Sequence, residues 1–159
     1  MSNVNIRKAE LTDAELLYSW ANNIEVRANS FNPQPIDFDE HFVWLQRKLS
    51  DSNTQLLIGL HDNVAFGQVR FDKDSNGFYE VDIHVSSDAK GRGLGKVLLR
   101  SGIEQVKKTS ADLQESCFLA VVFEENIASY RLFRSCGFEE IERKKIKDIP
   151  CCVLRLCNE

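Results

Sequence analysis

A glycine-rich turn follows a strand-like run at 78–85 and leads into a stretch with helical periodicity. The turn contains Gly91, Gly93 and Gly95 within residues 86–96. Such a turn at the start of a helix directs free backbone N–H groups, with the positive end of the helix dipole behind them, at an anion. A Walker loop would need Gly at Lys90 and Ser or Thr at Val97, and a dinucleotide fingerprint would need Gly or Ala at Lys96. The turn favours a phosphate site of another type, unless its glycines serve only the backbone conformation.

Two motifs of one family are present. The turn resembles the pyrophosphate-binding motif of the GCN5-related N-acetyltransferases (GNAT), Gln/Arg-x-x-Gly-x-Gly/Ala, with Lys90, Gly93 and Gly95 in the three marked places. Lysine there replaces the usual Gln or Arg and lacks the planar fork of arginine. Residues 126–138 resemble a second motif, Asn-x-x-Ala/Ser-x-x-Leu-Tyr/Phe-x-x-x-Gly-Phe, at the family's separation. The resemblance implies a GNAT fold and an acetyl-CoA-dependent N-acetyltransferase without a metal.

The resemblance also implies how acetyl-CoA binds. In the family the fourth and fifth strands, here 78–85 and 117–123, splay apart and the pantetheine arm lies between them. The thioester carbonyl then lies near the backbone N–H of Val85, where one donor can stabilise an oxyanion by roughly 3–4 kcal/mol. Asn126 would cap its helix and contact the arm or an ordered water. The residues expected to bind acetyl-CoA are Ile83, Val85, Lys90, Gly91, Arg92, Gly93, Leu94, Gly95, Lys96, Asn126, Ser129 and Phe133.

Transfer to an amine needs a base, because an alkyl ammonium is mostly protonated at pH 7. The candidate bases are Glu80, Asp82 and His84. These residues alternate with apolar ones and would share one face of a strand, although a solvated strand face would look the same. The tyrosine that often protonates the leaving thiolate is replaced by Phe133. Tyr130, three residues earlier, is a substitute proton donor unless it serves only as a packing aromatic.

The acceptor site is expected in 22–44 and in the last hairpin. Segments 25–32 and 67–72 resemble acetyltransferases of nucleotide-linked amino sugars in bacterial surface-glycan synthesis. Arginines there can meet phosphate, and Trp44 offers a stacking face. The candidate acceptor-binding residues are Arg27, Asn29, His41 and Arg70. Acetylation of a protein N-terminus, and a CoA-binding module without chemistry, remain alternatives.

Hydrophobic periodicity and turn residues predict the elements that position these groups. Strands are expected at 4–8, 55–60, 64–72, 78–85, 117–123, 138–146 and 151–156, with 117–123 buried on both faces. Four helices are expected: a short one that ends near residue 20, one that begins after Asp37, one that follows the glycine turn, and one that spans 126–137. Residues 22–36 are expected to form a loop. The order β-α-α-β-β-β-α-β-α-β-β predicts an α+β fold, with a mixed, mostly antiparallel sheet of about seven strands and helices on both faces.

Composition limits the other classes. The 159 residues, 43% of them hydrophobic, suffice for one domain covering 1–159. The net charge of −4 and the scattered charges exclude a nucleic-acid footprint, and no apolar run could span a bilayer. Five cysteines without zinc-type spacing are expected to be reduced thiols in a cytoplasmic protein. The expected partner is a small-molecule amine, and homodimers are common among such folds.

Overall fold

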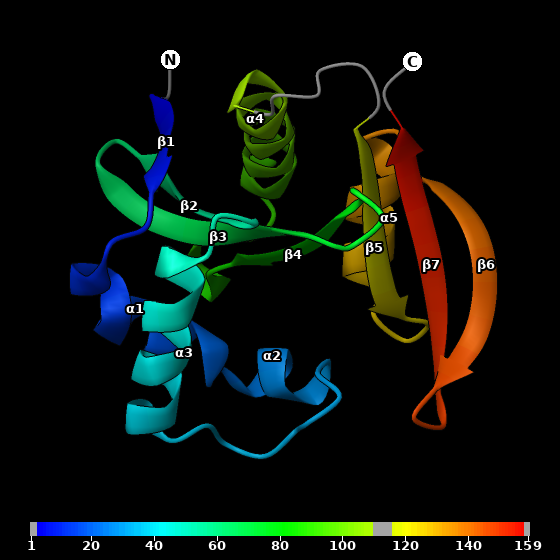
Figure 1. Cartoon of the computed structure of the whole chain (residues 1–159), viewed down its shortest axis with the longest axis horizontal. Helices are drawn as coiled ribbons and strands as arrows, with labels where there is room; N and C mark the ends of the chain where they lie inside the picture. The colour runs from blue at the N-terminus through cyan, green and yellow to red at the C-terminus, as the bar shows by residue number, and fades with distance from the viewer. Residues whose placement is uncertain (1–2, 110–115, 158–159) are drawn as a thin grey trace.

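The computed structural model describes residues 3–109 and 116–157. Its sheet of seven strands has the order β1-β2-β3-β4-β5-β7-β6, and adjacent strands are antiparallel except for the parallel pair β4–β5 (Figure 1). The strands are β1 Val4–Lys8, β2 Thr54–His61, β3 Val64–Lys73, β4 Tyr79–Val85, β5 Cys117–Phe123, β6 Glu139–Ile146 and β7 Ile149–Cys157. This arrangement confirms the predicted α+β class and the mixed, mostly antiparallel sheet.

Helices cover both faces of the sheet, as predicted. They are α1 Ala14–Ala21, α2 Ile24–Ala28, α3 Phe38–Ser50, α4 Leu94–Thr109 and α5 Ile127–Ser135, with short 3-10 turns at Leu11–Asp13 and Ser87–Ala89. Figure 1 shows α1, α2 and α3 on one side of β2–β4 and α4 on the other. Asp37 caps α3 by accepting the Glu40 N–H at 3.3 Å, which starts the helix where the sequence predicts it.

Two apolar clusters attach the helices to the sheet because successive strand residues face opposite sides. Val69 and Phe71 of β3 pack with Leu98 of α4 in the larger cluster. Leu45 of α3 packs with Ile58 of β2 in the smaller one. All five side chains are fully buried, and burial of each contributes about 1.5–3 kcal/mol. The alternation leaves the other side chains of β3 to face α1 and α3.

The helix α2 lies within the segment 22–36, which the sequence analysis predicts to be a loop. Asn23 caps this helix by accepting the Glu25 N–H at 2.9 Å. None of the five helical residues is buried, and Ile24 is 85% exposed. The segment therefore lacks the buried stripe by which a helix is recognised in a sequence. The predicted order is corrected to three helices between β1 and β2.

The prediction for β5 is also corrected. Its burial alternates, with Phe118, Ala120 and Val122 buried and the residues between them half-buried. The strand is therefore fully buried on one face only.

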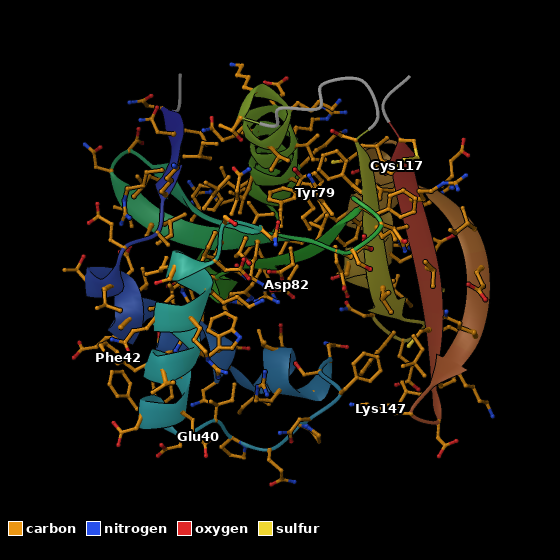
Figure 2. The ribbon with its side chains drawn as sticks, in the orientation of Figure 1. Glu40, Phe42, Tyr79, Asp82, Cys117 and Lys147 are labelled. Carbon is orange, nitrogen blue, oxygen red and sulfur yellow. A yellow bond between two sulfur atoms is a disulfide. The ribbon has the colours of Figure 1, made fainter. Side chains whose placement is uncertain are left out.

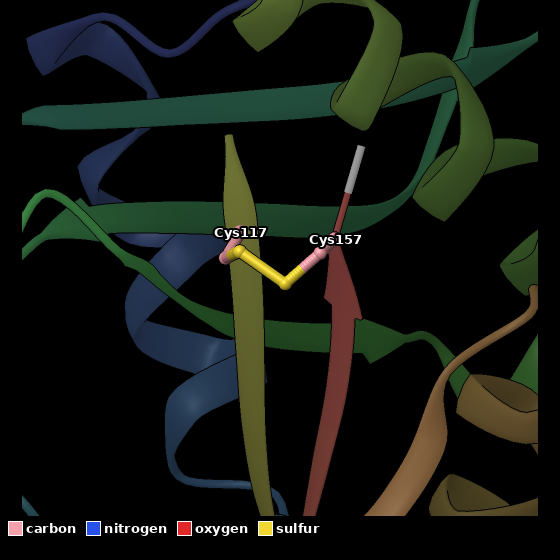
Figure 3. Close-up of a disulfide and its surroundings, with 2 residues drawn as sticks. All are labelled: Cys117 and Cys157. Atoms are coloured by element: carbon pink, nitrogen blue, oxygen red, sulfur yellow. A yellow bond between two sulfur atoms is a disulfide. The ribbon is translucent and has the colours of Figure 1, made fainter. Parts of the chain in front are cut away.

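Cys117 and Cys157 form a disulfide between the ends of β5 and β7 (Figure 3). The prediction that all five cysteines are reduced thiols is therefore wrong for this pair. The two residues are direct partners in the antiparallel register, with their Cα atoms 4.1 Å apart. Cys136, Cys151 and Cys152 are free. Strand register brings together residues 40 apart in the chain, and spacing alone does not reveal such a pairing.

No helix within 3–109 and 116–157 is both long enough and apolar enough to span a bilayer.

Candidate functional site

A cavity of about 950 Å³ lies where β4 and β5 diverge, and residues from both faces of the sheet line it. The two strands pair only at Tyr79–Phe118 and Glu80–Leu119. Beyond these pairs the strands separate, and Ile83 lines the cavity from the side of β4. The splaying expected from the family resemblance is present in the structure, and it opens a passage between the two faces.

The backbone of β4 directs polar groups into this gap. Ser86 donates its N–H to Phe66 O of β3 at 2.7 Å. Backbone groups of successive strand residues point to opposite edges, so the N–H of Val85 points away from β3. That edge faces the gap, and Val85 lines the cavity. The Val85 N–H is therefore directed at a ligand between the strands.

The glycine turn forms one end of the cavity. Gly91 and Gly93 have φ values of +78° and +73°, and a Cβ at either position would meet no described atom within 4 Å. Glycine is needed there for the left-handed backbone, and the space beside it is open. The first turn of α4 adds N–H groups without intrahelical partners and the positive end of its dipole. This arrangement can bind an anion such as a pyrophosphate.

Other residues of the turn have separate roles. The Lys90 ammonium, which lines the cavity, pairs with the Glu25 carboxylate of α2. Gly95 also lines the cavity, and a Cβ there would lie 3.3 Å from Val85 Cγ2. Arg92 lies outside the lining with its guanidinium 3.3 Å from His61 Nδ1, and Lys96 is outside the lining as well. The structure thus brings Lys90, Gly91, Gly93, Leu94 and Gly95 of the predicted set to the cavity.

The second motif contributes the start of α5. The Asn126 side chain accepts the Ser129 N–H at 3.3 Å, and both residues line the cavity. Phe133 is only 2% exposed and packs edge-on against Phe138, with ring centroids 5.0 Å apart. Tyr130 lies outside the lining and donates its hydroxyl to Glu140 at 2.9 Å. The Tyr130 hydroxyl is therefore engaged by β6, outside the cavity lining.

The three titratable side chains of β4 differ in their surroundings. Glu80 is exposed and outside the cavity lining, whereas Asp82 and His84 line it. Figure 2 shows Asp82 on the side of the sheet that faces α2 and α3. Its Oδ2 accepts the Gln68 Nε2 amide at 3.1 Å and lies 3.9 Å from Arg70 Nη1. Of the three candidate bases, the structure thus brings Asp82 and His84 to the cavity and not Glu80.

His84 is held between α1 and β3. Its ring lies edge-on to Trp20, with centroids 6.0 Å apart, and its Nε2 is buried without a hydrogen-bond partner among the described residues. Burial lowers the pKa of the imidazole, and the charge of Lys90 lowers it further, while Asp82 and Glu25 oppose the shift. The histidine is therefore neutral at pH 7 and can accept a proton.

The predicted acceptor residues all line the cavity but differ in how free they are. Arg27 donates to Ala21 O and Asn32 O, both at 2.8 Å, so its guanidinium mainly fixes the backbone around α2. Asn29 similarly donates to Glu25 O at 2.9 Å. These two residues shape the wall more than they offer free donors.

His41 and Arg70 belong to a second group, which is organised around Trp44. The Arg70 guanidinium lies 5.1 Å from the Trp44 ring centroid and donates to Asp72 at 2.8 Å. The His41 ring centroid lies 5.2 Å from that of Trp44. Burial lowers the pKa of His41, and the charge of Arg27 adds to the shift. A fixed guanidinium next to an aromatic face can bind a planar or anionic group of an acceptor.

The comparisons with known proteins decide the family. The model of the acetyltransferase (GNAT) family matches residues 17–138, more than half of the chain. The chain belongs to the GNAT family. As a member, the protein is an N-acetyltransferase.

Individual relatives are distant. The chain is 23% identical over 142 residues to the acetyltransferase PseH of Campylobacter jejuni, covering 89% of this chain and 86% of PseH. It is 26% identical over 137 residues to the L-amino acid N-acyltransferase MnaT of Escherichia coli, covering 83% and 76%. The fold is similar to that of spermidine N-acetyltransferase from Vibrio cholerae, solved in complex with CoA and spermine, with a TM-score of 0.83 at 16% identity, covering 97% of this chain and 95% of that chain. The structural likeness confirms the GNAT fold.

Gln68 and Trp20 are among the cavity residues of this GNAT enzyme that sequence reasoning missed. Gln68 is 9% exposed and lies two residues before Arg70, so both side chains face α1 and α3. The alternation of Gln68 and Arg70 with the apolar Val69 and Phe71 was the available signal. Trp20 lies at the end of α1, and only the tertiary fold brings it to β4.

Proposed function

We propose that this GNAT enzyme transfers an acetyl group from acetyl-CoA directly to a primary amine, and that the amine belongs to a nucleotide-linked sugar. The observation that carries the proposal is the continuous cavity at the divergence of β4 and β5. It joins an anion-binding turn on one side to a neutral histidine and a polar wall on the other. Such a passage fits acetyl-CoA, a long molecule with its reactive thioester at one end, together with an amine that enters from the opposite side.

The donor's pyrophosphate lies at the glycine turn and the start of α4. The open space beside Gly91 and Gly93 leaves their backbone accessible to phosphate oxygens. Lys90 supplies a positive charge there after exchanging its contact with Glu25. The pantetheine arm runs along the free edge of β4, beside Ile83, and contacts Asn126 and Ser129.

His84 serves as the general base, with Asp82 beside it. The amine reacts in its neutral form: its nitrogen forms a bond to the acetyl carbon, the carbon–sulfur bond breaks, and the nitrogen gives one proton to the His84 imidazole. The N–H of Val85 donates to the carbonyl oxygen while negative charge develops on it. The CoA thiolate leaves and takes a proton from water, since a thiol with a pKa near 8.5 is a tolerable leaving group.

The acceptor side favours a nucleotide-linked amino sugar. Arg70, fixed by Asp72, presents its remaining N–H groups to a phosphate, and Trp44 offers a stacking surface. The resemblance of 25–32 and 67–72 to acetyltransferases of such sugars agrees with this assignment. The buried His41 adds a neutral polar group that suits hydroxyls.

A panel assay tests both parts of the proposal. Release of free thiol from acetyl-CoA is measured with UDP-linked glucosamine, spermidine, L-amino acids and a peptide with a free N-terminus. We expect the highest kcat/KM with the nucleotide-linked sugar. Highest turnover of another member would refute the acceptor assignment, and acetyl-CoA binding without thiol release with any member would refute the transferase proposal.

A further inference from the structure

Five buried side-chain atoms have no hydrogen-bond partner within the described part of the chain. Three of them, His41 Nδ1, Gln68 Oε1 and His84 Nε2, belong to residues that line the cavity. The other two belong to Gln55 and His61, outside the lining. A buried polar atom left unpaired is costly, and native structures contain few of them. The three atoms are closed off from solvent in this structure, so a ligand meets them only after the covering side chains turn aside. Their concentration in residues of one cavity indicates that such a ligand supplies the missing partners.

Two of these atoms come from directly opposed residues. Gln68 of β3 and His84 of β4 are partners in the antiparallel register, and such partners project to the same face with Cβ atoms about 4.5–5.5 Å apart. Asp82, on the same face of β4, fixes the orientation of the Gln68 amide. A carboxylate only accepts hydrogen bonds, so the Nε2 group of Gln68 faces Asp82 and the Oε1 atom faces elsewhere.

We propose that Gln68 Oε1 and His84 Nε2 together hold the amino group of the acceptor. This inference rests on the proposed function, since it adds Gln68 to the site in which His84 is the base. A neutral primary amine has two N–H donors and one lone pair. One N–H bonds to Gln68 and the other to His84, which leaves the lone pair free for the acetyl carbon. The proton directed at His84 is the one that leaves when the new bond forms.

The arrangement predicts selectivity for primary amines. An N-methylated amine retains one N–H donor and leaves either Gln68 Oε1 or His84 Nε2 unpaired. A hydroxyl group likewise has a single proton to donate. The pair therefore discriminates by the number of N–H groups, independently of what the rest of the acceptor contacts.

The test compares Gln68→Met with Gln55→Met. Both substitutions remove an amide whose Oε1 atom is buried and unpartnered, but Gln55 donates to Thr109 Oγ1 at 2.9 Å and lies outside the cavity. The probes are the panel amine that the wild-type enzyme acetylates fastest and its N-methyl derivative. For Gln68→Met we expect kcat/KM with the primary amine to fall about tenfold or more, with acetyl-CoA affinity unchanged. The ratio of kcat/KM for the primary amine to kcat/KM for its N-methyl derivative should fall by a similar factor. Gln55→Met should leave both kcat/KM with the primary amine and this ratio unchanged.

Asp82→Asn provides a second variant if Gln68→Met does not fold. Asn offers both a donor and an acceptor, so the Gln68 amide is no longer held in one orientation, and the same loss of primary-amine preference is expected. An unchanged preference in the folded variants would overturn the inference. If the wild-type enzyme releases thiol with none of the amines, the proposed function itself is wrong, which distinguishes the two failures.

Discussion

Substitution of Gly93 by alanine separates the anion-binding role of the glycine turn from its conformational role. Gly93 has a φ of +73°, and an added Cβ would meet no atom of the described residues within 4 Å. The methyl group therefore causes strain without a steric clash. A non-glycine residue in the left-handed region costs about 1–2 kcal/mol, so the free energy of unfolding should fall by that amount and the fold should persist.

The loss of affinity for acetyl-CoA should be larger than this backbone strain alone would cause. The Cβ would occupy the space in which we place the pyrophosphate, and it would remove at least one backbone hydrogen bond to a charged oxygen. Such a bond contributes about 1.5–3 kcal/mol, which corresponds to an increase of about 10- to 150-fold in Kd. Titration calorimetry with acetyl-CoA measures Kd, and urea denaturation measures stability.

Gly77 supplies the matched control. It lies in the turn between β3 and β4 with a φ of +83°, and a Cβ there would also meet none of the described atoms within 4 Å. Gly77→Ala should therefore lose about the same 1–2 kcal/mol of stability while the Kd of acetyl-CoA stays unchanged, because the turn lies outside the cavity lining. Equal affinities for the two variants would refute the assignment of the turn as the pyrophosphate site.

Three further predictions concern the base, the core and the disulfide. His84→Gln should lower kcat by about 10²- to 10⁴-fold, and it should abolish the acid limb of the pH profile. Because burial lowers the pKa of His84, activity in the wild-type enzyme should be retained at neutral pH and lost only as pH falls below the ordinary histidine value of about 6.5. Gly102→Ala should lower the free energy of unfolding by about 1–3 kcal/mol in urea denaturation, since its Cβ would lie 2.9 Å from the Phe71 ring; no loss would contradict the close packing of α4 on β3. Cys157→Ser should lower stability by up to about 4 kcal/mol, as the disulfide closes a loop of 40 residues, and equal stability with and without a reductant in the wild-type protein would contradict this expectation.

Local patterns predicted the parts of the site that local structure determines. The alternation in β4 predicted a shared face for Asp82 and His84, and the glycine spacing predicted a turn before a helix. The same alternation did not separate Glu80 from the other two residues, because a strand pattern gives the face and not the point at which a neighbouring strand diverges. Glu80 pairs within the closed part of the β4–β5 ladder, whereas the cavity begins beyond it.

Features that depend on tertiary contacts were not predictable from the sequence. Tyr130 shares a helix with cavity residues, yet its hydroxyl bonds to Glu140 because the helix presents it to β6. Gln68 becomes significant only through its register with His84 on the next strand. The charge of Arg27 suggested a phosphate contact, but its hydrogen bonds go to backbone carbonyls around α2, a helix that the sequence did not indicate.

The gap that holds the site is fixed by the ladders on either side of it. On one side β4 pairs with β3 from Tyr79 to Val85, and on the other β5 pairs with β7 along its whole length. Closing the gap beyond Glu80 would require one of these ladders to break, with the loss of several backbone hydrogen bonds. The edge of β4 is therefore open before any ligand binds, and its N–H groups need no rearrangement to bind acetyl-CoA. Preorganised dipoles of this kind stabilise developing charge most effectively, so a backbone N–H at this edge suits the proposed oxyanion role without any side chain.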